Sequence, residues 1–229
     1  MTAPSRPAVP AAVLFDCDGV LADTEALHDR IIAEEIGGLG WDITPAEAAK
    51  RFRGLSWEAI LPIIQDRLGP DSVPATFHRD LIRRVLHALE NETIPVPGSQ
   101  AAIAAIVAAG VPLAVASNSS RPELATKLRR LGLAEVFGRR AFSVNDVPNA
   151  KPAPDMYRAA AAACNADPHH CVVVEDSVAG ARAGIAAGCR VLGFAHATPA
   201  AALAAVGAEP FADMAELPAL LGLAVPAAG

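Results

Sequence analysis

Short apolar runs alternate with helical segments along most of this chain, and this alternation restricts the folds open to it. The runs at 12–16, 112–117, 141–144, 171–175 and 190–194 are typical of strands buried on both faces. Helical patterns occupy 98–109, 121–131, 154–164 and 177–187. Strands that alternate with helices predict an α/β fold: a Rossmann-like parallel sheet core with helices on both faces. In such sheets, ligands bind beyond the carboxyl ends of the strands.

The composition favours close packing in this core. Hydrophobic residues make up 52% of the chain but aromatic residues only 4%, so the core must be built mainly from Ala, Val, Leu and Ile. Gly180 and Gly184 in the last of these helical segments, and Gly188 directly after it, recur every four residues. We therefore predict that one face of this helix approaches the sheet closely.

One segment interrupts the alternation. Between residues 24 and 92 no strand pattern is found, and helices are expected at 26–36, 45–52, 57–68 and 78–92. The last of these has an apolar stripe at helical spacing, from Leu81 to Leu89. The sequence therefore predicts an all-helical cap domain at 24–92, inserted into a core made of residues 1–23 and 93–229.

The net charge indicates which partners are unfavourable, and the cysteines indicate the compartment. A formal net charge of -6 argues against nucleic-acid or anionic-membrane surfaces. The four cysteines show no CxxC spacing, so we expect reduced thiols and a cytoplasmic protein. The chain has no apolar run near the roughly 20 residues of a membrane span, and residues 1–10 do not resemble a signal peptide. The expected state is a monomer or weak homo-oligomer.

Two carboxylates with one residue between them end the first predicted strand. Because strand side chains alternate, Asp16 and Asp18 should project to the same side, with Cys17 pointing away. Like charges this close require a cation or a proton to offset them. The pattern favours a metal-dependent site with a nucleophile and an acid/base. A plain turn completed by Gly19 remains an alternative at this point.

Three more polar clusters follow apolar runs. Ser117 and Asn118 could form an anion cradle at a strand end, or belong to an ordinary helix N-cap. Lys151 precedes a proline-stiffened helix start and is either held inward or solvated. Glu175 and Asp176 end a fully apolar strand, where they suit a hard cation or a cap. At one edge of one sheet, these clusters together would supply a nucleophile, an acid/base, an anion cradle, a cation and metal ligands.

The ordered motifs D-C-D-G-V, S-N-S, K-P-x-P-D and E-D-S-x-x-G resemble those of the haloacid dehalogenase-like superfamily of phosphotransferases. The helical insert resembles the cap of the branch that holds β-phosphoglucomutase and the small sugar-phosphate and phosphoglycolate phosphatases. The resemblance extends from about Ala11 to Leu221. It implies an enzyme that hydrolyses small phosphorylated metabolites, such as sugar phosphates.

The resemblance also implies roles for the residues of these motifs. Asp16 would attack the phosphorus and form an aspartyl-phosphate, and Asp18 would act as the acid/base. Ser117, the backbone of Asn118 and the side chain of Lys151 would bind the transferring phosphoryl oxygens.

A Mg²⁺ cofactor is implied as well. Its ligands would be Asp16, the backbone carbonyl of Asp18, and Asp176. Glu175 would stand behind these ligands or add a further one, and the sequence leaves both possibilities open.

In the insert, His28 matches a mutase histidine that couples cap closure to the acid/base, and Arg53-Gly54 resembles a loop that selects substrate. An exposed histidine and a solvated basic face are the alternatives. Trp57 stands where the mutase has an arginine that grips a second phosphate, and an indole cannot do this. Trp57 could stack on a sugar or simply pack in the cap. We therefore expect a phosphatase, with a sugar-phosphate mutase as the alternative and a non-catalytic binding module as the least favoured reading.

Overall fold

The structure, a computed structural model, describes residues 9–53, 55 and 57–223. The chain divides into two compact units, one of Met1–Asp23 with Ile94–Gly229 and the other of Thr24–Thr93. Among the described residues, no helix combines the length and apolar character needed to cross a membrane.

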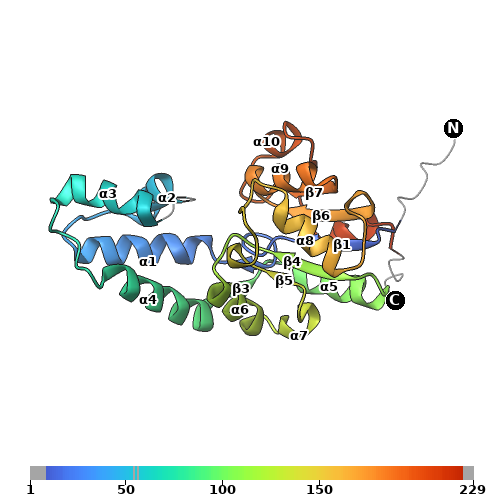
Figure 1. Ribbon diagram of the computed structural model, residues 1–229, viewed down its shortest axis with the longest axis horizontal. Coiled ribbons are helices and arrows are strands. Elements are labelled where there is room, and N and C mark those ends of the chain that lie inside the picture. Colours follow the sequence, from blue (N-terminus) through green and yellow to red (C-terminus); the bar gives the residue numbers. More distant parts are fainter. Residues whose placement is uncertain (1–8, 54, 56, 224–229) are drawn as a thin grey trace. The chain divides into compact units, whose positions relative to one another are not determined.

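The larger unit contains a parallel sheet, which its described residues form in the order β5-β4-β1-β6-β7-β8 (Figure 1). These strands are β1 (Ala12–Phe15), β4 (Leu113–Ala116), β5 (Ala141–Phe142), β6 (Cys171–Glu175), β7 (Arg190–Phe194) and β8 (Glu209–Phe211). The central strand β1 pairs with β4 and β6, with Phe15 opposite both Val115 and Val174. The predicted parallel α/β sheet is confirmed.

Two strands of this sheet differ clearly from the prediction. Strand β5 ends at Phe142, because Ser143 caps a short 3-10 helix, η1 (Val144–Asp146), instead of continuing the strand. Strand β8 was not predicted. It is a three-residue edge strand that contains Pro210, and proline in so short a run is a poor strand signal.

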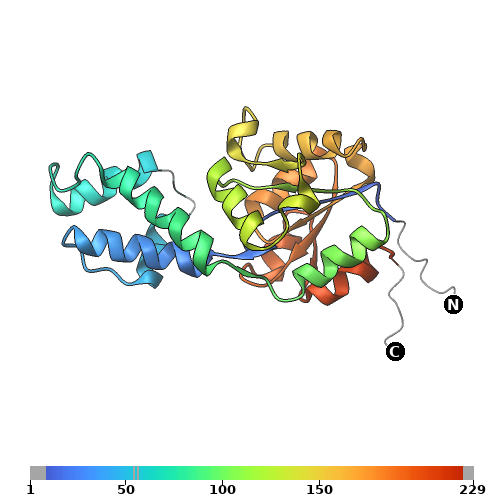
Figure 2. The ribbon, with the colours of Figure 1, turned by 90° about the horizontal axis from the view of Figure 1, so that it is seen from below.

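Alternating side chains divide the sheet core into two layers. Val13 and Phe15 pack against one set of helices, whereas Leu14 packs against the other. The first set is α5 (Ser99–Ala108), α6 (Arg121–Arg130), α7 (Ala134–Phe137) and α11 (Leu217–Leu220), with η3 (Met214–Glu216). The second is α8 (Asp155–Ala163), α9 (Val178–Ala187) and α10 (Ala200–Ala204). A short 3-10 helix, η2 (Pro168–His170), directly precedes β6. Figure 2 shows α5 and α11 side by side on one face of the sheet.

Helix α9 approaches the sheet through glycines, as the sequence predicted for two of three positions. A Cβ on Gly184 would lie 2.7 Å from Val191 Cγ2, and one on Gly180 would lie 1.7 Å from Glu175 Oε1. The prediction was wrong for Gly188, which follows the last residue of the helix. Its φ of 96° places it in the left-handed region, where it caps α9.

The smaller unit consists of α1 (Glu25–Gly38), α2 (Pro45–Phe52), α3 (Trp57–Leu68) and α4 (Phe77–Glu92). Its helices match the four predicted ones closely. Helix α1 packs on two sides: Ile36 joins a cluster with α2 and α3, and Ile31 joins one with α4. In the larger unit, β2 (Ala22–Asp23) and β3 (Ile94–Pro95) pair antiparallel. These strands lie where the chain leaves the larger unit and where it returns to it.

Candidate active site

The carboxyl edge of the sheet brings together residues from three strand ends. Asp16 directly follows β1, Ser117 follows β4, and Asp176 follows β6. Because β1 lies between β4 and β6 in a parallel sheet, these three ends meet at one place. Lys151 reaches the same place from the loop before α8.

Lys151 is the cation at the centre of a buried cluster. Its Nζ donates to Asp16 Oδ1 at 2.6 Å, to Glu175 Oε1 at 2.6 Å and to the Ala116 carbonyl at 2.8 Å. Tyr157 also donates its hydroxyl to Glu175 Oε1, at 2.8 Å. All these side chains are buried, so each charge interaction acts in a medium that screens it weakly.

Burial and neighbouring charge shift the pKa values of this cluster. Burial raises the pKa of Asp16 to about 7, and the charges of Glu175 and Asp18 add to this effect while Lys151 opposes it. For Lys151, burial lowers the pKa, but the carboxylates of Asp16 and Glu175 outweigh burial and raise it above its usual value. Lys151 therefore stays positively charged at neutral pH, where it can oppose the charge of a phosphoryl group.

Carboxylate oxygens from Asp16, Glu175 and Asp176 all lie within 4.8 Å of one another. Three carboxylates facing one lysine leave an excess of negative charge, and oxygen donors suit a hard divalent cation. Gly19 is required here, since a Cβ at this residue would lie 2.1 Å from Asp176 Oδ2. The donor set therefore fits a divalent metal ion.

Glu175 is already well occupied by protein donors. Its Oε1 accepts from Lys151 and Tyr157, and its Oε2 accepts from the backbone N–H and the hydroxyl of Ser177. Four donors on one buried carboxylate favour the alternative in which Glu175 holds Lys151 in place and stands behind the predicted ligands, Asp16 and Asp176.

Asp18 lies in a second ion pair, separate from that cluster. Lys127 Nζ is 2.6 Å from both Asp18 carboxylate oxygens and 2.6 Å from Ser119 Oγ. The hydroxyls of Ser117 and Ser119 donate to Asp18 Oδ2 at 3.2 and 2.9 Å. Cys17, between the two aspartates, points into the apolar core as predicted. The Asp18 carboxylate is not part of the three-carboxylate cluster, and the predicted role of its backbone carbonyl stays a prediction.

Asn118 has a role that the sequence did not indicate. Its Oδ1 accepts from the Lys151 backbone N–H at 3.0 Å, and its Nδ2 donates to the Lys151 carbonyl at 3.2 Å. The side chain therefore clamps the loop that carries Lys151, whereas the predicted phosphate contact concerned the Asn118 backbone.

The predicted residues of the smaller unit have partners within that unit. Arg53 forms ion pairs with Glu25, at 2.7 Å, and with Asp29, both on α1. Trp57 stacks on His78 of α4, with ring centroids 4.8 Å apart, in line with the packing alternative. His28 Nε2 has no hydrogen-bond partner in the described part of the chain.

Gly54, the remaining predicted residue of this unit, lies outside the described residues.

Two residues of the site were missed from sequence: Lys127 and Tyr157. Lys127 lies in a helix with several charged residues, where a lysine is normally expected to face solvent. Tyr157 is the only tyrosine of the chain and lies six residues after Lys151, a spacing that carries no signal by itself. Ser119 belongs to the S-N-S motif, but its contact with Asp18 was not predicted.

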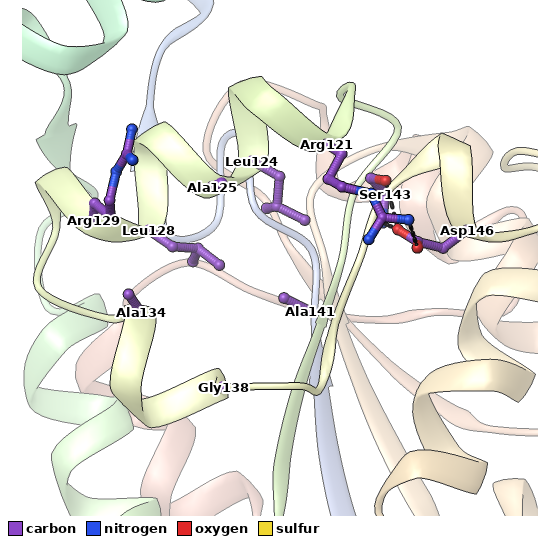
Figure 3. Close-up of a pocket in the computed structure, with 10 residues that line it drawn as sticks. All are labelled: Arg121, Leu124, Ala125, Leu128, Arg129, Ala134, Gly138, Ala141, Ser143 and Asp146. Atoms are coloured by element: carbon purple, nitrogen blue, oxygen red, sulfur yellow. Dashed lines mark hydrogen bonds and ion pairs between the residues drawn. The ribbon is translucent and has the colours of Figure 1, made fainter.

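A separate cavity of about 250 Å³ lies against α6, α7 and β5 (Figure 3). Leu124, Leu128 and Ala141 supply apolar lining, and Arg121 pairs with Asp146 at one end. No predicted site residue lines this cavity, so it is distinct from the carboxylate cluster.

Comparison with known proteins shows the family of this chain. Residues 10–188 match the family model described as haloacid dehalogenase-like hydrolase. The chain belongs to the haloacid dehalogenase-like hydrolase family. The expected resemblance is therefore confirmed.

Several similar proteins are named as phosphatases. The chain is 32% identical to 6-phosphogluconate phosphatase of Escherichia coli K12, over 80% of this chain and 81% of that protein. It is 33% identical to hexitol phosphatase B of the same organism, over 81% of this chain and 84% of that protein. A solved family hydrolase from Deinococcus radiodurans, with bound phosphate and sodium, is 34% identical. It aligns with a TM-score of 0.78 over 93% of this chain and 96% of that one.

Proposed function

We propose that this chain is a Mg²⁺-dependent phosphatase that hydrolyses small phosphorylated sugars or related metabolites through an aspartyl-phosphate. The observation that carries the proposal is the Asp16–Lys151 pair within a three-carboxylate cluster, with Asp18 held separately beside Ser117. The phosphatases among its relatives act on 6-phosphogluconate and hexitol phosphates by name, and this supports a phosphorylated sugar derivative as the substrate class.

In the first step, an Asp16 oxygen attacks the phosphorus and forms the aspartyl-phosphate, while the bond from phosphorus to the alcohol oxygen breaks. Asp18 gives its proton to the departing alcohol. The ammonium of Lys151 and the hydroxyl of Ser117 oppose the charge that develops on the phosphoryl oxygens. A divalent cation held by Asp16 and Asp176 would supply further positive charge there.

In the second step, water attacks the phosphorus of the aspartyl-phosphate. Asp18, now ionised, takes the proton from this water, and the bond from phosphorus to Asp16 breaks. Inorganic phosphate leaves, and both carboxyl groups return to their starting states. The same residue thus serves as acid in one step and base in the next.

The substrate contacts predicted for His28, Arg53, Gly54 and Trp57 stay predictions. The Asn118 side chain adds to the proposal, because its clamp on the Lys151 loop fixes where the ammonium stands.

The test is phosphate release from a panel of phosphorylated sugars, sugar acids and hexitols, with Mg²⁺ or with EDTA. We expect Mg²⁺-dependent release from at least one of these esters, and its loss in Asp16→Asn. Absence of release across the panel would refute the proposal. Conversion of β-glucose 1-phosphate to glucose 6-phosphate, followed with a coupled dehydrogenase and a bisphosphate activator, would point to the mutase instead.

A further inference from the structure

Lys127 is a fully buried lysine that the mechanism described above does not use. Its side chain is 0% exposed, whereas the side chain of its partner Asp18 is 31% exposed. It extends from α6, on one face of the sheet, and its ammonium contacts both oxygens of Asp18 and the hydroxyl of Ser119.

Burying an ammonium group is costly even when it is paired, and an apolar residue of similar size often stabilises a fold equally well. A buried lysine is therefore weak evidence for a contribution to stability. The position of Lys127 is more informative, because its ammonium contacts both carboxylate oxygens of Asp18. Asp16, two residues earlier, is held by a different lysine, Lys151.

The contacts fix the orientation of the Asp18 carboxylate. With an ammonium 2.6 Å from both oxygens, a rotation of the carboxylate plane would lengthen at least one of the two contacts. Ser119 ties the arrangement together, since its hydroxyl donates to Asp18 Oδ2 and accepts from Lys127 Nζ. The backbone N–H of Ser119 in turn donates to Ser117 Oγ at 3.0 Å.

We propose that Lys127, acting with Ser119, is a positioning residue that anchors the Asp18 carboxylate apart from the Asp16–Glu175–Asp176 cluster and in place for proton transfer. The proposal rests on the proposed phosphatase function and adds a residue to its machinery. Without the anchor, the carboxylate rotates among several orientations, and only some of them reach the leaving oxygen or the attacking water.

The variant Lys127→Met removes the ammonium and retains a long, flexible side chain of similar reach. For an alkyl phosphate, where both steps need Asp18, kcat should fall about 10- to 100-fold, a part of the full general acid–base contribution. KM should change less than about threefold, because the phosphate contacts at Ser117 and Lys151 remain.

A change of leaving group separates positioning from a general structural defect. With p-nitrophenyl phosphate the first step needs little protonation of the leaving group, while the second step still needs Asp18 as a base. Stopped-flow measurements on Lys127→Met should therefore show a burst of about one p-nitrophenolate per active site, followed by slow turnover. The ratio of burst rate to steady-state rate should exceed that of wild type about tenfold or more. A misfolded fraction would reduce the burst amplitude and leave this ratio unchanged.

Thr126→Val is the matched control. Thr126 is buried on the same helix, and its hydroxyl accepts from Arg129. Its kcat and burst ratio should stay within about twofold of wild type.

Ser119→Ala is the second variant, at a half-buried position where a change is tolerated more easily. It should shift kcat and the burst ratio in the same direction by a smaller factor, and it decides the matter if Lys127→Met does not fold. The proposal is overturned if the deciding variant keeps wild-type kcat, or loses activity equally on both substrates with an unchanged burst ratio. If the wild type itself releases no phosphate from either substrate, the proposed function falls first, and this inference falls with it.

Discussion

Replacing Asp16 by Asn should stabilise the metal-free protein at alkaline pH while abolishing turnover. Asp16 is only 8% exposed and lies among Glu175, Asp18 and Lys151. Burial raises its pKa in the folded state to about 7, against an ordinary value of 3.8. A carboxyl group whose pKa rises on folding contributes stability that is complete below its unfolded pKa and is lost as pH increases towards its folded pKa. The amide of the variant does not titrate and escapes this loss.

The magnitude follows from the size of the pKa change. Because one pKa unit corresponds to about 1.4 kcal/mol, the ionised Asp16 destabilises the fold above pH 7 by at most about 4 kcal/mol. Between pH 5 and pH 8, the advantage of Asp16→Asn should therefore grow by about 2–3 kcal/mol. Lys151 loses one acceptor in the variant but keeps Glu175 and the Ala116 carbonyl, so its ammonium remains paired.

The assay is urea unfolding in EDTA at pH 5 and pH 8, followed by far-UV circular dichroism. Both tryptophans of the chain, Trp41 and Trp57, lie in the smaller unit, so tryptophan fluorescence would report on that unit and not on Asp16. Asp66→Asn, a change at an exposed aspartate of α3, is the control and should give no pH-dependent gain of this size. An equal effect of Asp16→Asn at both pH values, or destabilisation at pH 8, would refute the reasoning.

Three further outcomes are expected. Gly180→Ala should lower the free energy of unfolding by more than about 3 kcal/mol, because its Cβ would lie 1.7 Å from Glu175 Oε1. The control Gly37→Ala, which has open space around it, should raise the free energy of unfolding by about 0.5–1 kcal/mol. Thermal unfolding of both variants compares the two effects. Asn118→Ala should cut kcat about tenfold or more with little change in melting temperature, since the Lys151 loop loses two hydrogen bonds; steady-state kinetics with calorimetry tests this. Mg²⁺ at about 100 times its Kd should stabilise the wild type by about 2.7 kcal/mol at pH 8, and this gain should be largely lost in Asp176→Asn, which thermal shift measurements would show.

Much of the site could be predicted because its residues lie at strand ends. A strand that is apolar throughout, such as β6, must be buried on both faces, and the polar residues after it mark the edge of the sheet. Asp16, Ser117 and Asp176 each follow such a strand. Their proximity is a consequence of the parallel topology, which the alternation of strands and helices already indicated.

The partners of these residues could not be predicted in the same way. Lys127 contacts Asp18 across 109 positions of sequence, and this contact depends on how α6 sits on the sheet. The two-residue strands β2 and β3, which were not predicted, are likewise too short to show a period of two. Tyr157 acts through Glu175, so nothing in its local sequence distinguishes it from an ordinary polar residue. Asn118 was predicted at the site for its backbone, but the contact of its side chain with Lys151 was not.

The two lysines explain how neighbouring carboxylates can serve different steps. In the proposed mechanism Asp16 attacks the phosphorus in the first step and leaves it in the second, while Asp18 gives up a proton and takes one back. A single shared cation would couple the two carboxylates more strongly, because each proton transfer at Asp18 would also change the pairing of Asp16. The fold supplies one lysine to each: Lys151 from the loop before α8, on one face of the sheet, and Lys127 from α6, on the other. Two aspartates two residues apart at one strand end are thus each paired with a different lysine from opposite sides of the sheet, although the charge of Asp18 still adds to the raised pKa of Asp16.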